Sequence, residues 1–148
     1  DWGQAEKGSE RLEFWKMLAA FRREHPILHP QQPLRLMDHI SCGYPDLSYH
    51  GESAWKLGNL YHSRCAGLMF CGKYARKADG GEDSFVYAGV NMHWEPHTLA
   101  LPKLPKGMDW EVVCSTAGSA LPETANLLCT VAPRSVVICI GKNRKDRE

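Results

Sequence analysis

The sequence lacks a long hydrophobic run and a surplus of charge of either sign. Lys and Arg number 18 against 17 Asp and Glu, which gives a formal charge of +1. Such a balance provides no basic field for nucleic acid and no acidic excess typical of disorder. The apolar runs are also far shorter than a membrane span. We therefore expect a globular protein without a nucleic-acid or membrane partner.

An initiator Met, a signal peptide and an affinity tag are absent as well. A start at Asp1 suggests a chain cut from a longer one. The 148 residues suit one domain with a real core. Hydrophobic residues make up 43% and charged residues 24%, which is ordinary for a globular protein.

No Cys-x-x-Cys motif occurs among the six cysteines. An even count would permit three disulfides. Four of the cysteines, however, lie in or beside apolar runs typical of strands, where a free thiol behaves as a small buried hydrophobe: these are Cys71, Cys114, Cys129 and Cys139. We therefore expect reduced, structural cysteines and a cytoplasmic protein.

The first 30 residues predict one amphipathic helix, from about Ser9 to Glu24, which Pro26 ends. Its apolar stripe contains Leu12, Phe14, Trp15, Leu18, Ala19 and Phe21. Residues 31–64 read as an irregular connection, with short extended pieces at Leu34–His39 and Asp46–His50. Residues 142–148 read as a solvated tail.

Residues 65–141 carry the β signal. Short apolar or β-branched runs alternate with turn residues, which is typical of a sandwich. The predicted strands are Cys65–Cys71, Ser84–Asn91, Thr98–Leu101, Trp110–Ser115, Leu127–Val131 and Ser135–Ile140. The fold class is therefore mainly β, an antiparallel β-sandwich preceded by one or two helices.

No metal site and no cofactor are predicted. The best local group is His62, Cys65 and Cys71, with Cys42 upstream. Cys65 and Cys71 are six apart on one expected strand, so their side chains share a face but stand too far apart for structural zinc. A cysteine nucleophile would need a nearby His and an orienting group, and nothing local suggests them.

An aromatic and polar group lies near the middle of the irregular connection. Tyr49, His50 and Trp55 occur there with Asp46 and Glu52. Aromatic faces beside carboxylates and imidazoles suit sugar rings, so the first three residues are candidates for substrate contact. The alternative is a loop that these aromatics simply pin to the domain.

Taken in order, these pieces resemble the end of the isoamylase-type glycogen debranching enzymes and pullulanases. LEFWKMLAAFRREHPIL, with His25 and Pro26 at its end, is similar to the last barrel helix of that family. DLSYHGESAW is similar to the loop that follows, although many relatives carry Asp-x-Thr-Trp where this chain has Ser48 and Tyr49. GLMFCG, DSFVYAGVNMHWEPHTLALPKLPKGMDWEVV and APRSVVICI are similar to the C-terminal β-sandwich.

The resemblance implies a non-catalytic C-terminal domain that stabilises the catalytic (β/α)8 barrel of an enzyme cleaving α-1,6 branch points in α-glucan. The initial helix would be left over from the end of that barrel. Retaining glycosidases need two carboxyl groups about 5 Å apart. In barrel enzymes these groups sit at the ends of barrel strands. No position here matches them, so no catalytic residue is expected and the chain alone should be inactive.

Two further expectations concern binding. Without a barrel, the helix could self-associate through Leu12, Trp15 and Leu18. As an alternative function, the sandwich could be a carbohydrate-binding module that holds α-glucan through Trp94 or Trp110.

Overall fold

The computed structural model describes residues 8–118 and 120–147. It is mainly β, with two antiparallel sheets and two α-helices in these ranges. Helix α2 spans Ser9–Glu24, as the sequence predicts. Glu10 lies in its first turn and Arg22 and Arg23 in its last, which favours the helix dipole. His25 ends α2, and the 3-10 turn η1, Pro26–Leu28, follows.

The larger sheet has five strands in the order β1-β2-β3-β8-β5, and every neighbouring pair is antiparallel. Its strands are β1 (Leu47–His50), β2 (Cys65–Phe70), β3 (Val86–Asn91), β5 (Met108–Ser115) and β8 (Ser135–Asn143).

The smaller sheet has three strands in the order β4-β7-β6. These are β4 (His97–Ala100), β6 (Thr124–Ala125) and β7 (Leu128–Val131). The remaining elements are α3 (Leu60–Ser63) and the 3-10 turns η2 (Gly72–Tyr74) and η3 (Arg144–Arg147).

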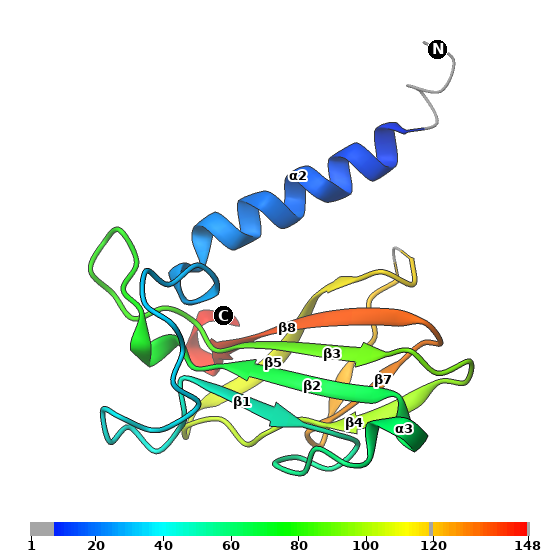
Figure 1. Cartoon of the computed structure of the whole chain (residues 1–148). Coiled ribbons are helices and arrows are strands. Elements are labelled where there is room, and N and C mark those ends of the chain that lie inside the picture. Colours follow the sequence, from blue (N-terminus) through cyan, green and yellow to red (C-terminus); the bar gives the residue numbers. More distant parts are fainter. Residues whose placement is uncertain (1–7, 119, 148) are drawn as a thin grey trace.

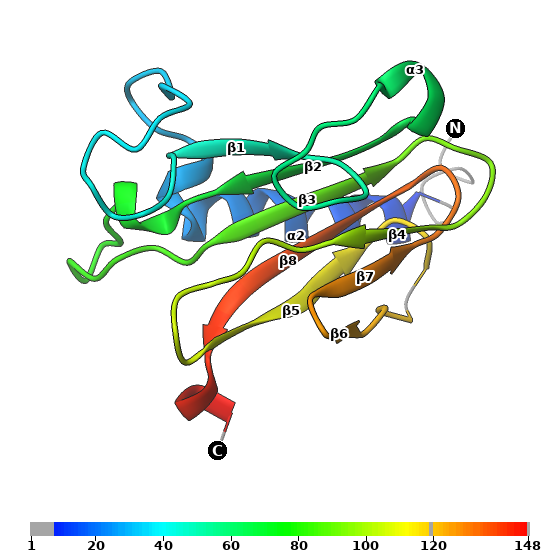
Figure 2. The same ribbon diagram turned by 90° about the horizontal axis from the view of Figure 1, so that it is seen from below.

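The core lies between the two sheets. The smaller sheet covers one face of the larger, as Figure 2 shows. Alternate residues of the strands point into this space, as the pleat requires. The larger sheet contributes Met69, Tyr87 and Val137, and the smaller sheet contributes Leu99 and Val131, all of them fully or almost fully buried.

The opposite side of the larger sheet is also apolar. We call it the outer face; its half-buried residues are Ala66, Leu68, Phe70, Ala88, Val90, Val136, Ile138 and Ile140. Helix α2 lies on this side (Figures 1 and 2). None of the described residues of α2 is buried, and Leu12 and Trp15 are 54% and 64% exposed. The helix therefore leaves much of its own apolar stripe uncovered.

Two expectations about local structure were wrong. Leu34–His39 is not a strand: Leu36 has φ +58°, and the backbone N–H groups of Arg35 and Leu36 both donate to the Asp46 carboxylate. Residues 142–148 are not wholly a solvated tail either. Strand β8 continues to Asn143, and Lys142 Nζ lies 2.6 Å from Glu111 Oε1.

In the described part of the chain, each helix is too short or too polar to cross a membrane. Each of the six cysteines lies in the described ranges, and all are free thiols.

Candidate functional site

The loop that follows β1 is built around a buried histidine. His50 is fully buried, and its Nδ1 accepts a hydrogen bond from the backbone N–H of Trp55 at 2.7 Å. An Nδ1 that accepts leaves the proton on Nε2, which lies 2.8 Å from Ser48 Oγ and donates to it. Burial lowers the pKa of His50 to about 4, so the ring is neutral and suited to these two bonds.

The three predicted sugar-contact residues do not form one surface: His50 is buried, and Tyr49 and Trp55 are exposed in different places. Trp55, which is 47% exposed, has φ +65° and meets the His50 ring edge-on at a centroid distance of 4.7 Å. Tyr49 sits one residue before His50 on β1 and pairs with Leu68, which places it at the outer face. Trp55 thus presents an indole to solvent, His50 positions it, and Tyr49 lies elsewhere.

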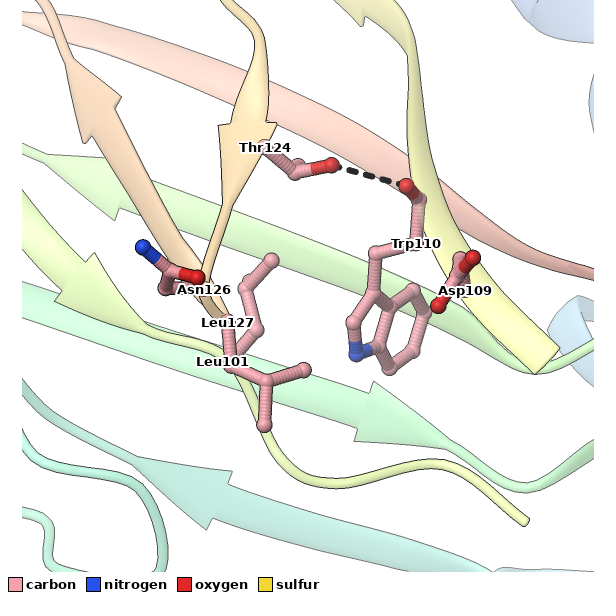
Figure 3. A pocket seen from close by; sticks show the side chains of 6 residues that line it. All are labelled: Leu101, Asp109, Trp110, Thr124, Asn126 and Leu127. Carbon is pink, nitrogen blue, oxygen red and sulfur yellow. Dashed lines mark hydrogen bonds between the residues drawn. The ribbon is translucent and has the colours of Figure 1, made fainter. Parts of the chain in front are cut away.

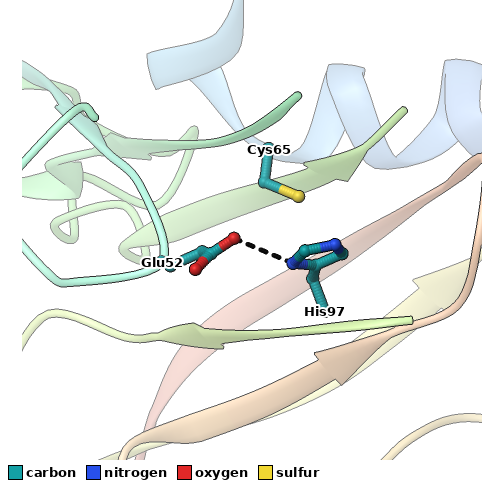
Figure 4. A group of neighbouring side chains, drawn as sticks. All are labelled: Glu52, Cys65 and His97. Atoms are coloured by element: carbon teal, nitrogen blue, oxygen red, sulfur yellow. Dashed lines mark hydrogen bonds and ion pairs between the residues drawn. The ribbon is translucent and has the colours of Figure 1, made fainter. Parts of the chain in front are cut away.

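Three side chains that are distant in sequence meet beside this loop. Glu52 comes from the loop, Cys65 begins β2 and His97 begins β4, and Figure 4 shows them pointing toward one another. His97 Nδ1 lies 2.8 Å from Glu52 Oε1, and each of the three residues offers a ligand atom within 4.8 Å of the other two. Cys65 is fully buried, whereas Glu52 is exposed.

The same histidine belongs to a second group. His93, Glu95 and His97 also offer ligand atoms within 4.8 Å of one another, and the His93 and His97 rings meet edge-on at 4.7 Å. Sequence reasoning missed the first group because its residues come from separate segments of the chain. It also missed the second group, although the His-x-x-x-His spacing of residues 93 and 97 was a local signal for it.

Asn91 fixes the turn that carries these histidines. Its fully buried side-chain amide donates to the carbonyl oxygens of Glu95, Val131 and Ala132 at 2.8–3.1 Å. Its Oδ1 accepts from the backbone N–H of His93 at 2.9 Å. A buried amide with so many partners cannot be replaced without leaving backbone groups unpaired, which explains why an Asn stands before the Met-His-Trp-Glu-Pro turn.

The two tryptophans proposed for an alternative binding function are in different environments. Trp110 is 3% exposed, and its Nε1 donates to the Pro102 carbonyl at 2.7 Å, so it offers no ring face to a sugar. Trp94 is 58% exposed, but His93 stacks on its ring at 4.0 Å and the Arg64 guanidinium lies 5.0 Å from its centroid.

A small pocket opens beside Trp110, between β5 and β6 (Figure 3). Its volume is about 210 Å³, and Leu101, Asp109, Thr124, Asn126 and Leu127 complete its lining. Ligand sites usually measure about 300–1,000 Å³. The hydroxyl of Thr124 is already engaged, since it donates to the Trp110 carbonyl at 2.8 Å. The pocket is therefore smaller than the usual site for a sugar.

A buried pair joins the end of α2 to the strand region. His25 Nδ1 lies 2.7 Å from Asp83 Oδ1, and the same carboxylate accepts from the backbone N–H groups of Ile27 and Ser84 at 3.0 and 2.7 Å. Burial raises the pKa of Asp83, but the hydrogen bonds from His25, Ile27 and Ser84 outweigh it, so the net pKa is lowered. This contact sets the point at which the helix leaves the β body.

The chain was compared with protein-family models and with curated proteins, and neither comparison found a match. The residue types in the two side-chain groups differ from those of a glycosidase site. Neither the Glu52–Cys65–His97 group nor the His93–Glu95–His97 group holds two carboxyl groups, the pair that glycoside hydrolysis uses.

Proposed function

We propose that this chain is the non-catalytic C-terminal region of a glycogen debranching enzyme or pullulanase, which hydrolyses α-1,6-glucosidic branch points. In this proposal the two sheets form the C-terminal β-sandwich, and α2 is the last helix of the (β/α)8 barrel. The region stabilises the barrel by packing on it, and the parent enzyme acts on α-glucan. The free cysteines support a cytoplasmic location.

One observation carries the proposal: the larger sheet has an apolar outer face that is only half-buried, and the amphipathic helix on the same side leaves its apolar stripe incompletely covered. The outer face is a continuous set of aliphatic and aromatic side chains on β2, β3 and β8. Above it, α2 contributes no buried residue among those described. Contiguous apolar surface of this kind marks a site of protein association, and a barrel continuing from α2 would lie against it.

The motifs behind the family resemblance have structural roles that suit such a domain. His25, in the Arg-Glu-His-Pro segment, binds Asp83 and ties the helix to the strands. Asp46, which opens the Asp-Leu-Ser-Tyr segment, holds the preceding loop by accepting from the backbone N–H groups of Arg35 and Leu36, and it also accepts from that of Leu47. His25 thus maintains the contact between helix and strands, and Asp46 maintains the loop that connects them. A domain attached to a barrel through this helix requires such contacts.

A contact with substrate is proposed for Trp55 alone. Its exposed indole is a flat apolar surface, and His50 and Ser48 hold the loop beneath it. In the intact enzyme, Trp55→Ala should raise KM for branched glucan and leave kcat nearly unchanged. The matched variant Leu57→Ala removes another exposed apolar side chain from the same loop and should leave both constants unchanged. Equal kinetics for the two variants would exclude the contact.

The alternative function, an independent α-glucan-binding module, has less support. It would rest on Trp94, because Trp110 is buried, and Trp94 already contacts His93 and Arg64. Titration of the chain with maltooligosaccharides decides between the two functions. Saturable binding that Trp94→Ala abolishes would favour the module.

The parentage has a direct test in the coding sequence upstream of Asp1. The proposal predicts barrel strands there, with an Asp nucleophile and a Glu acid at strand ends. An upstream sequence without those motifs would overturn it.

A further inference from the structure

The side-chain cluster between the Trp55 loop and the β strands matches the chemistry of a metal centre. Cys65 supplies a thiol, His97 an imidazole and Glu52 a carboxylate, and the three ligand atoms lie within 4.8 Å of one another. Sulfur, nitrogen and oxygen ligands of these types are those that Zn²⁺ takes in proteins. We propose that Glu52, Cys65 and His97 bind a Zn²⁺-type divalent cation.

The orientation of His97 fits the site. Its Nδ1 lies 2.8 Å from Glu52 Oε1, on the side of the ring that faces the carboxylate (Figure 4). Nδ1 is therefore the nitrogen that would coordinate the cation, and a cation held between Nδ1 and the carboxylate takes the place of the hydrogen bond that joins them here. The proton of the neutral imidazole then sits on Nε2, which is buried without a hydrogen-bond partner in the described part of the chain.

The strands and the loop that carry these three residues favour a preformed site. Cys65 and His97 stand at the starts of β2 and β4, elements whose backbones are fixed by their sheets. Glu52 is on the exposed loop, and the backbone carbonyl of Glu52 accepts from the Ala100 N–H at 3.0 Å. Zinc bond lengths of about 2.0–2.3 Å place ligand atoms roughly 3.5 Å apart. The flexible side chain of Glu52 can move by the small distance that brings its carboxylate close enough to the other two ligand atoms.

Further donors stand next to this group. His93 meets the His97 ring edge-on, and Glu95 belongs to the same neighbouring set. Three protein ligands leave a fourth tetrahedral position for water or for one of these groups. Burial, with the nearby Glu52 charge, raises the pKa of the Cys65 thiol. Metal binding must therefore displace the thiol proton, and each ion bound releases it to solvent.

The test uses the intact chain, freed of metal, and titrates it with CoCl₂ and then ZnCl₂. We expect one equivalent of Co²⁺ to produce a thiolate-to-metal charge-transfer absorption, which Zn²⁺ then displaces. Cys65→Ala should abolish this absorption, and His97→Gln and Glu52→Gln should each weaken binding at least tenfold. Cys42→Ser, which alters a half-buried thiol elsewhere, should leave the titration unchanged.

Because Glu52 is exposed, Glu52→Gln should leave the fold intact, so weaker binding by this variant reports the loss of a ligand. The thermal unfolding of each variant is measured in parallel to check that it is folded. A titration that shows no charge-transfer absorption would overturn the proposal. An absorption that survives Cys65→Ala in a folded chain, or that Cys42→Ser removes, would overturn it as well. In either case the Glu52–His97 contact would be only an ion pair that anchors the loop.

Discussion

His50 illustrates how one buried side chain can make stability depend on pH. Its folded-state pKa is about 4, below the ordinary value near 6.5, because burial disfavours the charged ring. Between these two values the unfolded chain binds a proton that the folded chain does not, so stability falls as pH falls.

We therefore expect the free energy of unfolding to decrease by up to ~1.4 kcal/mol per pH unit between about pH 6.5 and pH 4. Urea unfolding across this range measures the slope. His50→Gln should lower stability at pH 7 and reduce the slope, whereas the exposed His62→Gln should leave it unchanged. A slope identical in wild type and His50→Gln would contradict this assignment.

The hydrogen bonds of Asp83 lead to a prediction about stability. Its carboxylate accepts three hydrogen bonds, from His25, Ile27 and Ser84. Because hydrogen bonds to charged groups contribute about 1.5–3 kcal/mol each and an amide keeps only part of them, Asp83→Asn should cost about 2–4 kcal/mol. The neighbouring Glu82→Gln loses only an exposed ion pair with Arg76 and should cost under ~1 kcal/mol.

The pH dependence of Asp83 has the same direction as that of His50 but a lower range. A depressed pKa means that the stabilisation is complete above the unfolded value near 3.9 and is lost as pH falls through the folded value. Asp83→Asn should therefore flatten the stability curve only below about pH 4. A curve that flattens nearer pH 6 would contradict the role given to this residue.

At the scale of elements, local patterns predicted the longer segments well. The apolar period and Pro26 gave α2, and β-branched runs gave β3 and β8. Strand β6 has only two residues and lies outside the predicted strands, because so short a segment carries no period. The loop at Leu34–His39 depended on Asp46, about ten residues further along, which no local pattern can indicate.

Helix α2 leads to a prediction about assembly. Leu12 and Trp15 are exposed on it, while Leu18 is half-buried. Burial of a large apolar side chain contributes about 1.5–3 kcal/mol, so the isolated chain should self-associate through this helix at high concentration. Sedimentation velocity measures the association. Trp15→Glu should shift the chain to monomer, and Lys16→Glu, exposed on the same helix, should not. A monomer at all concentrations would contradict the prediction.

At the scale of the whole molecule, sheet order and the meeting of distant residues could not be read from the sequence. Strand β8 pairs with both β3 and β5, so the last long strand lies inside the sheet. The sequence predicted a strand over Ser135–Ile140 but not which strands flank it. The Glu52–Cys65–His97 group arises from the same long-range pairing, which is why a search for local ligand spacing passed over it.

The outer face is unusual for a sheet in this position. A sheet that packs one face against a second sheet already has a complete core, and its other face is commonly polar. Here the other face is apolar on β2, β3 and β8, and the adjacent helix does not bury itself on it. We interpret this surface as the docking site of the proposed barrel.

The most direct test of this account is the binding of the chain to the barrel that the proposal places upstream of it, produced as a separate protein. Ile138→Lys places a charge in the outer face, and Thr130→Lys places one on the exposed side of the smaller sheet. The account predicts that wild type and Thr130→Lys bind alike, and that Ile138→Lys, still folded by thermal unfolding, binds at least tenfold more weakly, a loss of about 1.4 kcal/mol. Equal binding by all three chains, or binding by none, would contradict it.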